Sequence, residues 1–182
     1  KYFISKLDFV RMLILYLYGG LYLDCDTYCQ QKYDFTQHKS LVLIKEPQVH
    51  VKINYAGYDF VIINGYLYSD KRNPNLLKIL EGYINRAPLE KQHILLSTGP
   101  ASLRYIYDTL DQKSIDFIPS EGFINKIDNG YSYTTYDNTW STAKVFNKKV
   151  IHFIWVDQYN IQNNIIVPDT YEKNIESWRK NY

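Results

Sequence analysis

Two aspartates, Asp24 and Asp26, stand two residues apart in the sequence GGLYLDCDT at 19–27, directly after an apolar run. Two carboxylates this close repel each other, so they must be hydrated, paired with cationic side chains or bound to a cation. Hard divalent cations prefer carboxylate oxygen as a ligand. The pair therefore predicts a metal site where a buried strand ends, which is where open α/β sheets usually bind ligands.

The residue between the two acids is a cysteine. We expect Cys25 to point away from both carboxylates, because alternate residues of an extended chain face opposite sides. Cys25 and Cys29 are the two cysteines of the sequence, and no second pair completes a four-ligand zinc site. We therefore interpret Cys25 as a packing residue.

Helices and short strands that could position the acids alternate along the chain. Apolar residues at helical spacing predict a helix over 4–18, with Ser5 as its N-cap and Gly19-Gly20 as its end. A short strand over 21–23 then delivers the acid pair, and the chain is expected to leave the sheet there as a loop. Other predicted elements are strands over 41–44, 58–63, 117–119 and 150–156, the second ending on Asn64, helices over 75–85, 100–110 and 170–181, and a loop over 125–142.

Length and composition predict one soluble globular domain. The chain has 182 residues, of which 46% are hydrophobic and 22% charged. A net charge of +2 is too small to indicate a nucleic-acid or membrane-surface partner. No apolar run approaches the roughly 20 residues of a membrane-spanning helix, and the first residues do not form a signal peptide, so we expect a cytoplasmic chain without a membrane segment.

The surroundings of the acid pair carry a family resemblance. The runs SKLDFVR at 5–11, ILY at 14–16 and YGGLYLDCD at 18–26 closely resemble the signature S-D-x-x-R … L-Y-x-Y-G-G-I-Y-x-D-x-D. This signature is typical of the DXD glycosyltransferases of family 32, which are related to the glucosylating clostridial toxins. Weaker similarities continue at 62–66 and 98–100, and the run TYDNTW at 135–140 resembles the closing motif H-x-x-G-S-W with only its tryptophan kept.

The resemblance implies a GT-A-like α/β fold with a mixed sheet flanked by helices. It also implies a metal-dependent, retaining transferase that moves a hexose from a nucleotide diphosphate sugar, UDP-linked, to a hydroxyl of a glycan, protein or lipid acceptor. Such a donor leaves as a diphosphate, whose developing charge a bound Mn²⁺ or Mg²⁺ neutralises. No nucleic-acid partner is implied.

The same resemblance assigns roles to individual residues. Asp26 binds the metal directly, and Asp24 contacts it through water or holds sugar and ribose hydroxyls. Asp8 and Arg11, three residues apart on one helix face, grip the donor, although an ordinary ion pair explains them as well. The implied catalytic residues are Asp24, Asp26 and Arg11, and further implied donor-binding residues are Tyr22, Asn64, Trp140 and Trp155. Trp155 stacks on the base by resemblance, and core packing is the alternative.

The order of the motifs differs from the family's. The runs NKKVIHFIWV at 147–156 and YEKNIESWRKN at 171–181 resemble I-P-K-I-I-H-x-I-W … S-W-R, with which the family domain begins. A circular permutation within a single domain, 1–182, explains this order: 1–140 is the DXD-containing half, 141–149 a linker and 150–182 the family's first strand and helix. A stretch that spans two tandem copies is the alternative, and it would leave the domain incomplete.

Two rival functions remain. A phosphatase of the haloacid dehalogenase type also ends a strand on D-x-D, but a threonine is expected two residues after its second aspartate, whereas Thr27 follows Asp26 directly. The other rival is a degenerate, inactive relative that binds nucleotide or glycan without turnover. The altered motif around Trp140 motivates this second alternative.

Overall fold

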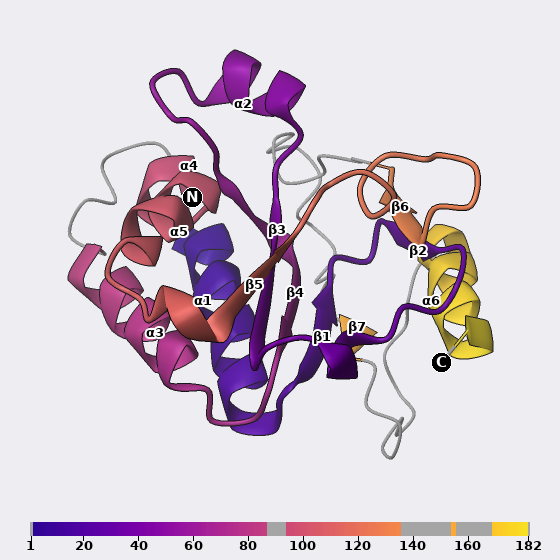
Figure 1. Ribbon diagram of the computed structural model, residues 1–182, viewed down its shortest axis with the longest axis horizontal. Coiled ribbons are helices and arrows are strands. Elements are labelled where there is room, and N and C mark those ends of the chain that lie inside the picture. The colour runs from indigo at the N-terminus through magenta and orange to yellow at the C-terminus, as the bar shows by residue number, and fades with distance from the viewer. Residues whose placement is uncertain (1, 87–93, 136–153, 156–168, 182) are drawn as a thin grey trace. The chain divides into compact units, whose positions relative to one another are not determined.

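The computed structural model describes residues 2–86, 94–135, 154–155 and 169–181 (Figure 1). The chain divides into two compact units, each built from two stretches of sequence. The first unit comprises 1–22 and 35–120, and the second comprises 23–34 and 121–182. Helices and strands alternate in the chain, which confirms the predicted α/β class.

The strands of the first unit form a mixed sheet in the order β5-β3-β4-β1. β3 pairs antiparallel with β4 and parallel with β5, so that Leu41 lies opposite both Ser69 and Ile115. The four strands are β1 (Gly20–Leu23), β3 (Leu41–Lys45), β4 (Ile62–Ser69) and β5 (Ile115–Ile118). The predicted mixed sheet is therefore confirmed for these strands.

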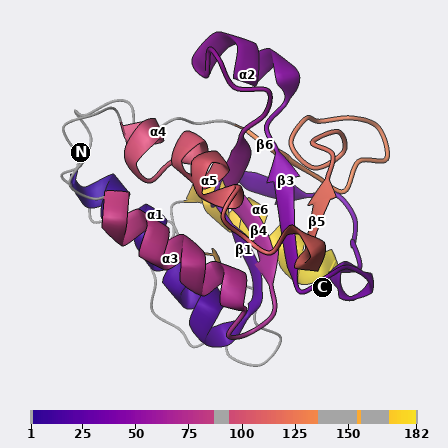
Figure 2. The ribbon, with the colours of Figure 1, turned by 60° about the vertical axis from the view of Figure 1, so that its left-hand side comes forward.

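Helices cover this sheet. α1 and α5 pack against β4, and α3 runs beside α1 (Figures 1 and 2). The helices among the described residues of the unit are α1 (Tyr2–Tyr18), α2 (Gln48–Asn54), α3 (Pro74–Arg86), α4 (Ile94–Ser97) and α5 (Pro100–Tyr107), with 3-10 turns at Phe35–Gln37 and Gln112–Ser114. Met12, Leu43, Ile79 and Leu103 are among the core side chains without exposed surface. Each such side chain contributes about 1.5 to 3 kcal/mol of burial free energy.

α1 ends at a glycine that no other residue can replace without strain. Gly19 has φ of 72° and donates its amide to the Leu15 carbonyl at 2.8 Å. A Cβ atom on Gly19 would lie 2.6 Å from the backbone nitrogen of Lys71. The positive φ and the close backbone therefore both require glycine where α1 turns into β1.

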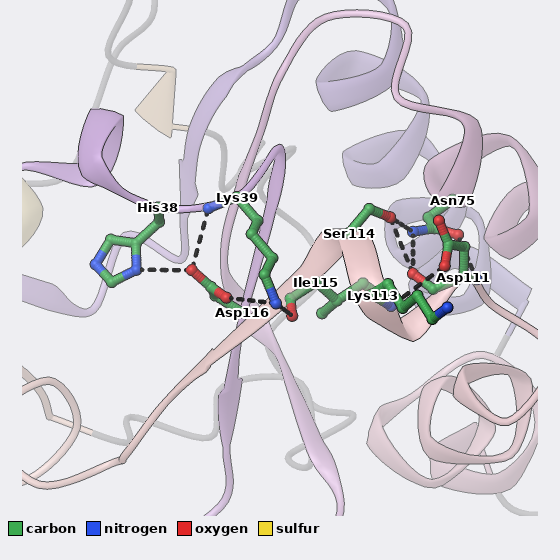
Figure 3. A network of polar contacts seen from close by, with 8 residues as sticks. All are labelled: His38, Lys39, Asn75, Asp111, Lys113, Ser114, Ile115 and Asp116. Carbon is green, nitrogen blue, oxygen red and sulfur yellow. Dashed lines mark hydrogen bonds and ion pairs between the residues drawn. The ribbon is translucent and has the colours of Figure 1, made fainter.

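A polar network holds the edge strand β5 to the start of β3 (Figure 3). The Asp116 carboxylate accepts hydrogen bonds from the Lys39 amide at 3.1 Å and contacts Lys39 Nζ and His38 Nδ1, each at 3.2 Å. These contacts hold the pKa of Asp116 below its usual value, with the Lys39 amide as the largest cause. Nearby, Asn75 of α3 donates to the Asp111 carbonyl at 3.1 Å.

The second unit is a two-stranded ribbon with a helix packed on it (Figure 1). β2 (Thr27–Cys29) pairs antiparallel with β6 (Ser132–Thr134), and α6 (Asp169–Asn181) packs on β2. The rings of Tyr28 and Tyr133, which are opposite each other in the ribbon, stack with centroids 5.2 Å apart. β7 (Ile154–Trp155) is a further short strand.

Three expectations for local structure were wrong. α1 already begins at Tyr2, so Ser5 lies inside the helix and cannot cap it. β4 begins at Ile62 and continues to Ser69, so Asn64 is inside a strand rather than at its end. Part of the expected loop over 125–142 is the strand β6, because Ser132–Thr134 find their partners in β2.

The remaining helices and strands lie close to their predicted places, although α5 ends earlier, at Tyr107. β2, α2 and α4 were not predicted. The predicted linker, 141–149, falls outside the described residues. No helix in the described parts of the chain is long and apolar enough to cross a bilayer.

Candidate metal and donor site

The two predicted metal ligands lie in a tight turn of the second unit. Asp24, Cys25 and Asp26, which we call the acid turn, connect β1 to β2. The Thr27 amide donates to the Asp24 carbonyl at 3.0 Å and closes the turn. The prediction that the chain leaves the sheet at the acids is therefore confirmed.

Burial alternates along the acid turn and the strand that follows it. Cys25, Thr27 and Cys29 are buried, whereas Asp24, Asp26 and Tyr28 are half-buried. Alternation of this kind places successive side chains on opposite sides of the chain. The two carboxylates are therefore on the more exposed side, and Cys25 packs on the other side, as predicted.

Each of the three carbonyls in the acid turn accepts a hydrogen bond. Thr27 holds the first, as described above. The Cys25 carbonyl accepts from Asn174 Nδ2 of α6 at 2.8 Å, and the Asp26 carbonyl accepts from the Thr135 amide at 2.9 Å. The backbone under the two carboxylates is thus fixed from within the second unit.

α6 makes a second polar contact with this segment. The Cys29 amide donates to Ser177 Oγ at 2.9 Å, and Ser177 Oγ donates in turn to the Asn174 carbonyl at 2.6 Å. Burial raises the pKa of the Cys29 thiol to about 12, so the thiol is neutral at pH 7. Cys29 is therefore a buried, neutral side chain of β2, the strand on which α6 packs.

The two carboxylates of the acid turn fit a hard divalent cation whose other ligands come from substrate phosphates and water. Within the described part of the chain, no group of three or more His, Cys, Asp or Glu side chains could hold a metal ion by itself. Mg²⁺ and similar cations are commonly held by one or two carboxylates, with substrate phosphates and waters completing the shell. Asp24 and Asp26 match that pattern, and they do not match a closed structural zinc site.

The other predicted donor residues form a closed cluster in the first unit. Arg11 Nη2 lies 3.3 Å from Asp8 Oδ1, which confirms that the spacing of three places both on one helix face. Asn64 Nδ2 donates to Asp8 Oδ1 and Thr98 Oγ1 donates to Asp8 Oδ2, both at 2.9 Å. Arg11 Nη1 also donates to the Asn64 carbonyl at 2.7 Å. We call these four residues the Asp8 cluster.

The Asp8 cluster is buried. Asp8 is 3% exposed and Arg11 is 8% exposed. The Arg11 guanidinium lies over the Tyr22 ring, 4.9 Å from its centroid. Burial raises the pKa of nearby Tyr83, and the negative charge of Asp8 adds to that rise. Asp8 and Arg11 thus form a buried ion pair on α1. Their hydrogen bonds with Asn64 connect α1 to β4, and the hydrogen bond from Thr98 connects α1 to the segment just before α5.

The predicted tryptophans cannot be placed in either group. Trp140 falls outside the described residues. Trp155 belongs to β7, and its side chain is outside the described part of the chain as well. Thr98 lies in the segment 98–100, which has a weak family similarity in the sequence. The contacts of Asn174, Ser177 and Thr135 with the acid turn were not predicted. Asn174 and Ser177 stand three residues apart in the predicted helix over 170–181, and two polar residues at this spacing were the signal in the sequence that could have indicated them.

Comparison with known proteins connects this chain to sugar transfer. Residues 1–43, which include α1, β1, the acid turn and β2, match the family described as "Glycosyltransferase sugar-binding region containing DXD motif". Over 161 residues the chain is 28% identical to inositol phosphoceramide mannosyltransferase 1 of Schizosaccharomyces pombe. The alignment covers 86% of this chain and 46% of that protein, so the chain spans about half the length of the curated relative it matches.

These similarities support a glycosyl transfer role and a DXD-type site. The narrower resemblance to family 32 and to the clostridial toxins stays a prediction. The same holds for the circular permutation.

Proposed function

We propose that this chain carries the metal and donor site of a glycosyltransferase that moves a hexose from a nucleotide diphosphate sugar to an acceptor hydroxyl. The observation that carries the proposal is the acid turn. Its three carbonyls are all held by hydrogen bonds, and its two carboxylates are on the more exposed side. Such an arrangement presents two oxygen ligands while the backbone stays fixed.

Asp26 is proposed as the direct metal ligand and Asp24 as the ligand that acts through water or holds sugar hydroxyls. A bound Mn²⁺ or Mg²⁺ would neutralise the charge that develops on the departing diphosphate. The fixed backbone restricts the positions that both side chains can adopt before a metal binds, so less ordering is needed on binding. Retention of the anomeric configuration belongs to the proposal by resemblance.

For Asp8 and Arg11 the resemblance implies contact with the donor, and this role stays a proposal. Their contacts within the first unit support a structural role as well, because both charges are already satisfied by each other, Asn64 and Thr98. A variant that changes donor KM without changing stability would separate the two roles.

The similarity to a named relative decides which substrates we propose to test first. Because the chain is similar to a protein named as a mannosyltransferase that acts on inositol phosphoceramide, a mannosyl donor and a lipid acceptor are the first substrates to test. Uridine diphosphate hexoses are the second group, as the resemblance implies.

The test is hydrolysis of a panel of uridine and guanosine diphosphate hexoses, measured with manganese and with a chelator. We expect slow, manganese-dependent hydrolysis of at least one donor by the parent chain. Asp26→Asn should lower that rate by at least about 100-fold, a typical loss when a group that stabilises developing charge is removed. Asp128→Asn, which changes an exposed carboxylate of the same unit, is the matched control and should leave the rate unchanged.

Each outcome has a definite reading. Asp26→Asn with the parent's rate would show that the acid turn is not the metal site. Donor binding without hydrolysis would favour the degenerate relative, and release of phosphate from an aryl phosphate that depends on Asp24 would favour the phosphatase.

A further inference from the structure

α6 reaches the acid turn with two polar side chains from one face. Asn174 and Ser177 are three residues apart, so both lie on the same side of the helix. Each is 8% exposed. One binds the carbonyl of Cys25 and the other accepts the amide of Cys29, at 2.8 and 2.9 Å. The neighbouring residues Lys173 and Glu176 on the same helix are exposed.

The contact of Asn174 is placed where it matters most for the two acids. Cys25 stands between Asp24 and Asp26, so its carbonyl belongs to the peptide that directly precedes Asp26. Rotation of that peptide would change the direction of the Asp26 side chain relative to that of Asp24. The hydrogen bond from the Asn174 side-chain amide to the Cys25 carbonyl opposes this rotation. The Ser177 hydroxyl accepts the Cys29 amide and donates to the backbone carbonyl of Asn174, so it connects Asn174 to Cys29.

We propose that Asn174 and Ser177 are positioning residues of the metal site: they hold the backbone of the acid turn so that Asp24 and Asp26 can bind one divalent cation together. This inference rests on the proposed function. Metal sites require their ligands within about 0.5 Å of the productive geometry, and loss of groups that orient ligands typically costs 10- to 100-fold in metal affinity. In this proposal, neither residue is itself a metal ligand.

The experiment measures the dissociation constant of manganese alone, and of manganese with UDP, by electron paramagnetic resonance. Asn174→Ala and Ser177→Ala should each weaken manganese binding by about 10-fold or more. Lys173→Ala and Glu176→Ala, on the exposed side of α6, are matched controls and should bind as the parent does. Ser177→Thr keeps the hydroxyl and should restore the parent affinity.

A second measurement separates positioning from simple loss of structure. Thermal unfolding and circular dichroism identify the variants that are folded at the assay temperature, and only these enter the comparison. Exchange of the Cys29 amide proton should be faster in Ser177→Ala, because its acceptor is gone. If Asn174→Ala does not fold, Ser177→Ala with its threonine rescue carries the test.

The failures of the two proposals can be told apart. If the parent binds manganese, Asp26→Asn abolishes binding and folded Asn174→Ala and Ser177→Ala bind as the parent does, the positioning role is wrong and the proposed function stands. If the parent binds no manganese with or without UDP, the proposed metal site and this inference are both overturned.

Discussion

The carboxylates of the Asp8 cluster and of the acid turn differ in how deeply they are buried. In the first unit, both oxygens of the Asp8 side chain accept hydrogen bonds, and the charge is balanced by Arg11 inside the core. In the second unit, the three carbonyls of the acid turn accept hydrogen bonds, and Asp24 and Asp26 are half-buried.

This difference separates stability from binding. A carboxylate whose lone pairs are satisfied inside the protein stabilises the fold, because breaking a buried pair leaves a charge without a partner. A carboxylate on a fixed backbone at a more exposed position contributes less to folding and is better suited to bind a cation. Substitutions in the two regions should therefore change different properties.

The largest effect on stability is expected from Asp8→Asn. The substitution leaves the buried Arg11 guanidinium without its counter-charge, so the free energy of unfolding should fall by about 3 to 5 kcal/mol. Urea denaturation followed by circular dichroism measures it. Asp70→Asn, at an exposed position of the same unit, is the control and should change the free energy by less than about 0.5 kcal/mol. Equal stability of both variants would remove the contrast between the two regions.

A smaller effect of opposite sign is expected from Tyr83→Phe. The Tyr83 hydroxyl is buried and has no hydrogen-bond partner among the described residues. Because a buried hydroxyl without a partner is costly, its removal should raise the free energy of unfolding by up to about 1 kcal/mol. The same denaturation experiment measures it. A clear loss of stability would mean that the hydroxyl takes part in the polar network around Asp8.

Asp116→Asn tests a carboxylate that is partly exposed and that binds Lys39 and His38 within the fold. The folded-state pKa of Asp116 is lowered, so its stabilising contribution is present above its ordinary pKa of about 4 and is lost as the pH falls through the folded-state pKa. The free energy of unfolding of the parent should therefore be higher than that of the variant by at most about 1 kcal/mol at pH 7, because ion pairs near a surface are weak. This difference should vanish in strong acid, where the Asp116 carboxylate is protonated. Melting temperatures between pH 7 and pH 2 measure this, and a difference independent of pH would contradict it.

Local sequence patterns were sufficient for much of the fold. The helix α1 and the glycines that end it, the short strand β1 and the turn at the acids all follow from apolar spacing and from glycine. The alternating burial around Cys25 also follows from the geometry of an extended chain. These features depend on neighbours in the sequence, so a single sequence contains the information.

Features that depend on distant partners could not be predicted in the same way. Asn64 suggested the end of a strand, yet it lies inside β4 because its polar groups bind Asp8 and Arg11. Residues 132–134 were expected to lie in a loop, but they form the strand β6. Their partners in β2 are about a hundred residues away in the chain, so local composition could not reveal the pairing. The contacts of α6 with the acid turn were missed for the same reason.

The central claim is that the acid turn binds a divalent cation. Asp24→Asn combined with Asp26→Asn should lower the free energy of unfolding by less than Asp8→Asn does, because Asp24 and Asp26 are half-buried whereas Asp8 is buried. The measurement is a manganese titration with UDP, followed by electron paramagnetic resonance. The account predicts one bound manganese ion in the parent and none in the folded double variant, and equal binding by the two proteins would contradict it.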